Sequence, residues 1–154
     1  MISLIVPAFN EARYLPRLLD SVERALDAYH GPRTDVEIVV ADDGSTDGTA
    51  AVAAARGCSV VPAGARSIAG ARNAGARAAR GEVLAFVDAD SLVHPETFNG
   101  VEAALASPRT IGGSTGVTME RWSAMRPSMM FASRSWSIWI TRSCDSSASS
   151  LPSS

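Results

Sequence analysis

The sequence contains no lysine and no glutamine, and all 14 of its basic residues are arginine. Any mechanism that requires a lysine is therefore excluded. Only two cysteines are present, Cys58 and Cys144, and their spacing fits neither a disulfide framework nor a zinc site. No apolar run approaches the roughly 20 residues of a membrane span. The first residues also lack the basic start and long apolar stretch of a secretory signal, so we expect a cytoplasmic protein.

The remaining composition is that of a globular protein, with 154 residues, 46% hydrophobic residues and a net charge of −2. This length can form one domain with a core, and the charge gives no reason to expect a nucleic-acid partner. Residues 119–154 differ, because they are rich in serine and contain all three tryptophans. We therefore predict a domain over 1–118 and an atypical, partly disordered Ser/Trp/Met-rich tail over 119–154.

Hydrophobic periodicity predicts strands that alternate with helices. The expected strands cover 3–8, 36–41, 59–62, 84–87 and 111–118, and the expected helices cover 12–29, a segment ending at 56, 68–80 and 95–106. Asn10 is the expected N-cap of the first helix, Ser45 or Thr46 that of the second, and Gly57 suits the C′ position of the second. The alternation predicts an α/β fold, with a mostly parallel sheet and helices on both faces.

Polar or acidic residues follow three of the expected strands: Asn10 and Glu11, Asp42 and Asp43, and Asp88 and Asp90. Ligands of open α/β sheets bind outside the carboxyl ends of the strands. In an extended segment the side chains of Asp88 and Asp90 point the same way, and carboxylates suit Mg²⁺ or Mn²⁺. We therefore expect one crevice that holds a divalent metal on a nucleotide diphosphate. The alternative is that these residues only end strands and start turns.

Residues 70–75 lie near the start of the third expected helix. A helix N-terminus favours anions, and the guanidinium of Arg72 suits a diphosphate. The alternative is that Gly70 and Gly75 are packing glycines beside a solvated arginine. These glycines have the spacing of a Walker P-loop, but Ala76 stands where that motif requires lysine.

Four segments, in this order and spacing, resemble the nucleotide-sugar half of family 2 glycosyltransferases, which have a GT-A, Rossmann-like fold. They are IVPAFNE (5–11), VVADDGSTD (39–47), GARNAG (70–75) and FVDAD (86–90). The resemblance covers residues 2–118. It implies an inverting transferase that moves a sugar from a nucleoside-diphosphate donor to an acceptor hydroxyl.

The resemblance also implies roles for individual residues. Pro7, Ala8 and Glu11 would line the base and ribose site, Asp42 would contact the base, Arg72 would lie near the diphosphate, Asp88 would face the ribose side, and Asp90 would hold Mn²⁺ or Mg²⁺. The family most often uses UDP-sugars, so a UDP-sugar is the first expected donor. Many members act on lipid or polysaccharide acceptors at the inner face of the membrane, which would make the protein peripheral there.

The sequence departs from the family after residue 118. The family's general base lies in an acidic motif well downstream, whereas the only later acids here are Glu120 and Asp145, in unrelated contexts. We therefore assign no catalytic base and expect a chain that is truncated or frameshifted, with a fold that is incomplete at its C-terminus. An uncovered sheet edge would then favour self-association. The alternative function is a non-catalytic nucleotide-binding module or pseudoenzyme.

Overall fold

The computed structural model describes residues 1–64, 66–106, 112–114 and 139–142. Its strands are β1 (Ile2–Ala8), β2 (Val36–Asp42), β3 (Ser59–Pro62), β4 (Val83–Phe86), β5 (Gly112–Ser114) and β6 (Trp139–Arg142). Its helices are α1 (Leu15–Ala28), the 3₁₀ turn η1 (Arg33–Asp35), α2 (Thr49–Ala55), α3 (Ile68–Ala78) and α4 (Thr97–Leu105).

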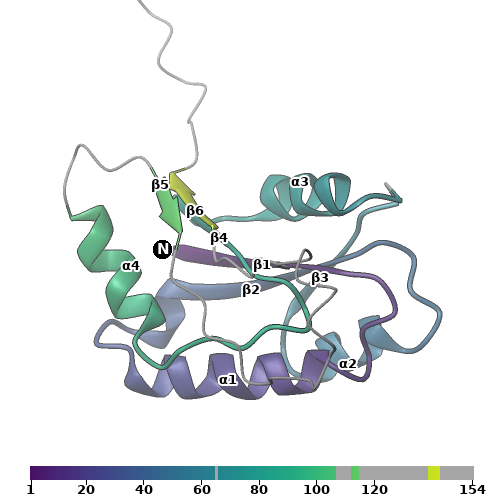
Figure 1. The fold of residues 1–154 in the computed structure, drawn as a ribbon, viewed down its shortest axis with the longest axis horizontal. Helices are drawn as coiled ribbons and strands as arrows, with labels where there is room; N and C mark the ends of the chain where they lie inside the picture. The colour runs from purple at the N-terminus through teal and green to yellow at the C-terminus, as the bar shows by residue number, and fades with distance from the viewer. Residues whose placement is uncertain (65, 107–111, 115–138, 143–154) are drawn as a thin grey trace, which may run out of the picture.

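The described strands form one sheet in the order β3-β2-β1-β4-β6-β5. β1 pairs in parallel with both β2 and β4, and β2 pairs in parallel with β3. The carboxyl ends of β1, β2 and β4 therefore lie together at one side of the sheet (Figure 1). α3 covers one face, and α1 and α2 cover the other, which confirms the predicted α/β layers (Figure 1).

The central strand β1 is buried at every residue because both of its faces are covered. Leu4 and Val6 belong to the core cluster on the face that α1 covers, where α1 contributes its buried apolar stripe of Leu15, Leu18, Leu19, Val22, Ala25 and Leu26. Ile5 faces α3, where a Cβ built on Gly75 would lie only 2.5 Å from Ile5 Cγ2. Gly75 is thus a packing glycine that lets α3 lie close to the sheet.

The predicted helix caps differ from those observed. α1 begins at Leu15, with Tyr14 at the N-cap position, and α2 begins at Thr49 after Gly48. Neither the expected cap Asn10 nor the pair Ser45 and Thr46 caps a helix, because these side chains bind the neighbouring loop instead. The assignment of Gly57 after α2 is confirmed by its left-handed φ of 73°.

Strand β6 comes from the segment that the sequence analysis assigned to the tail. It pairs antiparallel with β4 and with β5, and Ile140 is buried in the core. The edge of β4 is therefore covered, and the outer strands are β3 and β5. Self-association remains a prediction, now for those two edges. The other tail residues, 119–138 and 143–154, lie outside the described residues, as do the acids Glu120 and Asp145.

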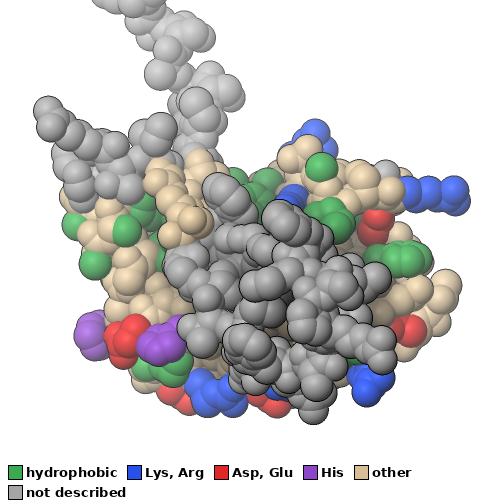
Figure 2. Space-filling view, in the orientation of Figure 1, with side chains coloured by type: hydrophobic (Ala, Val, Ile, Leu, Met, Phe, Trp, Pro, Cys, Tyr) green, Lys and Arg blue, Asp and Glu red, His purple; other side chains and the backbone are tan. Residues whose placement is uncertain are grey.

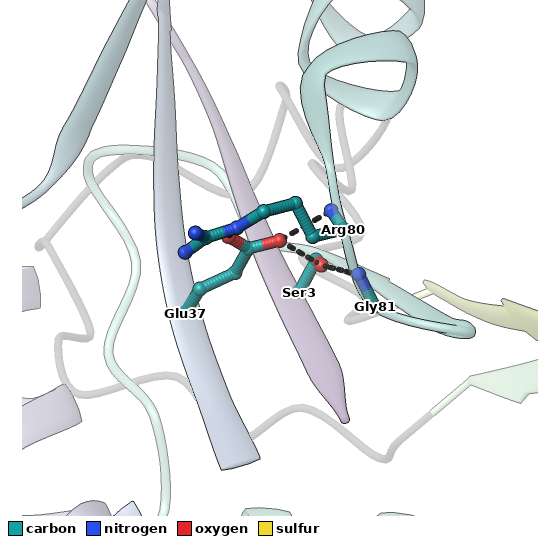
Figure 3. Close-up of polar contacts among 4 residues, drawn as sticks. All are labelled: Ser3, Glu37, Arg80 and Gly81. Carbon is teal, nitrogen blue, oxygen red and sulfur yellow. Dashed lines mark hydrogen bonds and ion pairs between the residues drawn. The ribbon is translucent and has the colours of Figure 1, made fainter. Parts of the chain in front are cut away.

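A hydrogen-bonded cluster fixes the amino ends of the central strands (Figure 3). The Ser3 hydroxyl donates to Glu37 Oε1 at 2.6 Å and accepts the Gly81 N–H at 2.8 Å. Arg80 donates to Glu37 from its backbone N–H and, at 2.8 Å, from Nε. Burial alone would raise the pKa of Glu37, but the hydrogen bonds from Ser3 and Arg80 outweigh it and lower that pKa. The cluster joins the start of β4 to β1 and β2.

Candidate functional site

An open pocket of about 500 Å³ lies where the carboxyl ends of β1, β2 and β4 meet the start of α3. It is lined by Pro7, Ala8, Phe9, Glu11, Asp43, Ile68, Ala71, Asp88, Ala89 and Asp90. Figure 2 shows acidic and hydrophobic side chains exposed together below α3, at the side of the molecule where the loops after β1 and β2 lie. The pocket thus combines apolar walls with carboxylates.

The end of β4 presents Asp88 and Asp90 on this pocket, as the sequence predicts. The parallel ladder continues one residue past β4, because the Val87 N–H donates to Ile5 O at 3.0 Å. A turn follows, in which the Ser91 N–H donates to Asp88 O at 3.0 Å. Ala89 is buried between the two acids, Asp88 is half-buried and Asp90 is exposed. The turn therefore anchors the segment and leaves both carboxylates at the pocket.

Glu11 reaches the same pocket from the loop after β1. Burial raises the pKa of Glu11, and the negative charges of Asp90, Asp47 and Asp88 raise it further. These acids are therefore close enough to repel one another. A bound cation would relieve this repulsion.

The donor set at the pocket suits a hard divalent cation only in part. Carboxylate oxygens are the ligands that Mg²⁺ and Mn²⁺ prefer. Within the described segments, however, no three His, Cys, Asp or Glu side chains are grouped closely enough to hold a metal. A cation held here by Asp90 would need further oxygen ligands from a substrate or from water. That combination is typical of sites in which the metal is bound together with a phosphate.

Arg72 lies beside the pocket on the first turns of α3. Its Nη2 donates to Asp88 Oδ1 at 2.7 Å, and its Nε is buried with no hydrogen-bond partner in the part of the chain that the structure describes. A second hollow of about 420 Å³ adjoins Arg72 and is lined also by Ala69, Asn73 and Phe86. The guanidinium thus stands between the acids and a neighbouring hollow, and the Arg72 side chain is 33% exposed.

Asp42 and Asp43 have different positions. Asp42 Oδ1 accepts the Ser45 N–H at 3.2 Å, so its side chain belongs to the turn after β2. Asp43 lines the pocket, and its Oδ1 accepts the Arg66 N–H at 3.0 Å. The sequence analysis selected Asp42 for the ligand, although the doubled acid at the end of β2 also indicated Asp43.

The structure brings together most of the predicted site residues. Those that line the pocket are Pro7, Ala8, Glu11, Asp88 and Asp90. Arg72 is attached to the pocket through Asp88, and Asp42 lies in the adjoining turn. Sequence reasoning gave no role to Phe9 and Ile68, which line the pocket and are 58% and 66% exposed. Their signal was a large apolar residue in the loop after β1, for Phe9, and at the first position of α3, for Ile68.

The sheet order, the helices on both faces and the pocket at the strand ends define an α/β protein of the GT-A type. The chain belongs to the family described as Glycosyl transferase family 2, which its residues 3–148 match. The match extends past residue 118 and includes the segment that forms β6. Among the described residues, no helix combines the length and the apolar character needed to cross a membrane.

Named relatives agree with this assignment. Validoxylamine A glucosyltransferase of Streptomyces hygroscopicus subsp. jinggangensis is 36% identical over 115 residues, which cover 70% of this chain and 26% of that protein. The crystal structure of S. aureus TarS 1–349 in complex with UDP-GlcNAc has 27% identity and a TM-score of 0.63, over 80% of this chain and 37% of that one.

A third similar protein is the mannosyltransferase PcManGT from Pyrobaculum calidifontis, solved in complex with GDP-Man and Mn²⁺. It has 29% identity and a TM-score of 0.62, over 72% of this chain and 34% of that one. The chain spans only 24 to 34% of the length of three curated relatives that it matches.

Proposed function

We propose that this chain binds a nucleoside-diphosphate sugar in the pocket at the carboxyl ends of β1, β2 and β4. The observation that carries the proposal is the convergence of Pro7, Ala8, Glu11, Asp88 and Asp90, from two strand ends, on one pocket. Related structures were solved with UDP-GlcNAc or with GDP-Man and Mn²⁺, which supports a nucleotide-sugar donor. A UDP-sugar is the first donor to test.

In this proposal the base and ribose lie against Pro7, Ala8 and Glu11. The exposed side chains of Phe9 and Ile68 give the pocket apolar surface that a flat base can cover. Asp42 was expected to contact the base, but the geometry favours Asp43, because Asp43 lines the pocket and Asp42 holds a turn.

Asp88, Asp90 and Arg72 would face the ribose and the diphosphate. Arg72 donates to Asp88 at 2.7 Å and its side chain is 33% exposed, so its guanidinium can hold Asp88 in place and offer another Nη–H group to a phosphate oxygen. Asp90 is the proposed ligand of Mn²⁺ or Mg²⁺. When bound, the metal would neutralise the negative charge that develops on a departing diphosphate.

Glycosyl transfer with inversion is the reaction that we propose for the donor. It requires a general base within hydrogen-bond reach of the acceptor hydroxyl. Among the described residues we assign this role to none, since the proposal already gives the pocket acids roles toward the donor. The alternative is a non-catalytic nucleotide-binding module. Sugar transfer or donor hydrolysis that is lost in Asp90→Ala would favour the enzyme over that alternative.

A thermal-shift titration tests donor binding. UDP, GDP, CDP and TDP would each be added with and without Mn²⁺ to the wild-type chain, to Asp90→Ala and to the control Asp20→Ala. Asp20 is an exposed acid of α1 that pairs with Arg56 at the end of α2. A ligand that binds only the folded state raises Tm, here by about 5 to 10 °C at a hundredfold excess over Kd. We expect a Mn²⁺-dependent shift with UDP in the wild type and in Asp20→Ala, and none in Asp90→Ala. The absence of any nucleotide-dependent shift in a chain that unfolds cooperatively would refute the proposal.

A further inference from the structure

The loops after β1 and β2 are joined by hydrogen bonds at the rim of the pocket. The Asp47 carboxylate accepts the Ala12 N–H on Oδ2 at 3.0 Å. Its Oδ1 accepts the Thr49 N–H at 3.1 Å and also the Thr49 hydroxyl. The same hydroxyl oxygen accepts the Glu11 N–H at 2.8 Å. One carboxylate and one threonine therefore fix two consecutive backbone amides of the loop that carries Glu11.

Asn10 adds a second connection between the same loops. Its N–H donates to Ser45 Oγ at 2.9 Å, and its Oδ1 accepts the Thr46 N–H at 2.8 Å. Asn10 has a left-handed φ of 57°, a conformation that asparagine adopts more readily than most residues other than glycine. The loop after β1 is thus tied to the loop after β2 by two hydrogen bonds at Asn10.

The position of Asp47 separates it from the ligand-facing residues. Asp47 does not line the pocket, whereas Glu11 does. Thr49 is fully buried at the start of α2, so its hydroxyl is a fixed point in the fold. The hydrogen bonds from Thr49 and Ala12 lower the pKa of Asp47, so the carboxylate is ionised at neutral pH. Asp47 can therefore affect a ligand in the pocket through its charge or through the loop that it holds.

We propose that Asp47 is a positioning residue, which acts through Thr49 and Ala12 to keep the Glu11 carboxylate at the nucleotide pocket. Such a restraint has a physical reason, because the charges of Asp90, Asp88 and Asp47 itself all repel the Glu11 carboxylate. The backbone hydrogen bonds that Asp47 and Thr49 accept hold the loop against this repulsion. Without the restraint, the loop would be expected to move Glu11 away from these acids. This inference rests on the proposed function of the pocket, and it adds a residue that lies outside the pocket.

An electrostatic role and a positioning role of Asp47 predict opposite changes in UDP affinity for the same substitution. Asp47→Asn removes a negative charge near a site for an anionic diphosphate, so a purely electrostatic role predicts tighter binding of UDP. A positioning role predicts weaker binding, because an asparagine has a single acceptor oxygen and presents an NH₂ group to one of the N–H donors. The direction of the change therefore distinguishes the two roles.

Calorimetry with UDP in the presence of Mn²⁺ tests whether Asp47 affects nucleotide binding. We expect Kd to rise about tenfold in Asp47→Asn and in Thr49→Val, and to stay within about twofold in Thr49→Ser, which keeps the hydroxyl. The control is Asp20→Asn, which removes a carboxylate of an exposed ion pair on α1. Unchanged or tighter binding in Asp47→Asn would overturn the proposal.

A double-mutant cycle with Glu11→Gln shows whether Asp47 acts through Glu11. If it does, Asp47→Asn combined with Glu11→Gln should bind UDP within about twofold of Glu11→Gln alone. Additive losses would mean that Asp47 acts by another route and would contradict the proposal.

Amide hydrogen exchange, measured without any nucleotide, tests whether Asp47 restrains the loop that carries Glu11. We expect the amides of Glu11 and Ala12 to exchange at least about tenfold faster in Asp47→Asn, with no change at Leu18 and Val22 inside α1. Equal exchange in wild type and variant would refute the restraint, even if UDP binds. If UDP fails to bind the wild type, the proposed function fails, and this measurement still decides whether the restraint exists.

Discussion

The two ends of the sheet use a glutamate in opposite ways. At the amino end, Glu37 accepts hydrogen bonds from Ser3 and Arg80, which lower its pKa despite its burial (Figure 3). At the carboxyl end, burial and the nearby Asp90, Asp47 and Asp88 raise the pKa of Glu11. The Glu37 carboxylate, surrounded by donors, stabilises the fold. The Glu11 carboxylate, surrounded by acids, would be stabilised by a bound cation. The comparison teaches that the surroundings of these two glutamates, hydrogen-bond donors for Glu37 and burial beside other acids for Glu11, set the direction in which each pKa shifts.

The largest change in stability is expected from adding a side-chain atom at the amino ends of the central strands, where Gly81 packs against Ser3. A Cβ at Gly81 would lie 2.6 Å from Ser3 Oγ and 2.7 Å from Met1 O. Gly81→Ala should therefore lower the free energy of unfolding by about 3 kcal/mol, measured by urea denaturation. Gly100→Ala is the control, since a Cβ there meets nothing within 4 Å and should stabilise α4 by about 0.5 to 1 kcal/mol. Equal stabilities for the two variants would show that the cluster tolerates displacement.

The variants Glu37→Gln and Glu11→Gln together test the contrast between the amino and carboxyl ends of the sheet. Glu37→Gln should lower the free energy of unfolding by about 2 kcal/mol at neutral pH, because the buried Ser3 hydroxyl and the N–H groups of Arg80 lose an ionised acceptor. The Glu37 pKa is lowered by folding, so its stabilisation is present above its unfolded pKa and is lost as pH falls through the folded value.

Glu11 should show the opposite dependence on pH. Its folded pKa is raised, so its contribution favours the folded state below the unfolded pKa and is lost as pH rises through the folded value. Glu11→Gln should remove this loss and leave stability at neutral pH unchanged or slightly higher. Urea denaturation at a series of pH values between about 3 and 7 checks both slopes. If both substitutions changed the pH dependence of the free energy of unfolding in the same direction, the distinction between the two ends of the sheet would be lost.

The smallest expected effect is a change in UDP affinity on substitution of the two acids at the end of β2. Asp43→Asn should weaken UDP binding about fivefold, close to 1 kcal/mol, because Asp43 lines the pocket. Asp42→Asn should change Kd by less than about twofold, since the oxygen that accepts the Ser45 N–H is retained. Calorimetry with UDP and Mn²⁺ compares the two. The reverse result would restore the family-based assignment of the base contact to Asp42.

Much of the fold could be predicted from the sequence because its signals are local. The apolar run 84–87 followed by Asp88 and Asp90 predicted a buried strand and a polar end, and the structure has β4 there with both acids at the pocket. The long amphipathic stripe predicted α1. The run 139–142 was missed as a strand, because its burial depends on pairing with β4, more than fifty residues away.

The sequence by itself determined the α/β class, the family and the set of acids at the strand ends, because apolar runs, turn residues and motifs act over a few neighbouring positions. Only the tertiary structure decided which acid faces the pocket and which holds a turn. It also turned Asn10, Ser45 and Thr46 from expected helix caps into links between two loops. Those contacts join segments about 35 residues apart, and a hydrogen bond forms wherever folding brings a donor and an acceptor within about 3 Å.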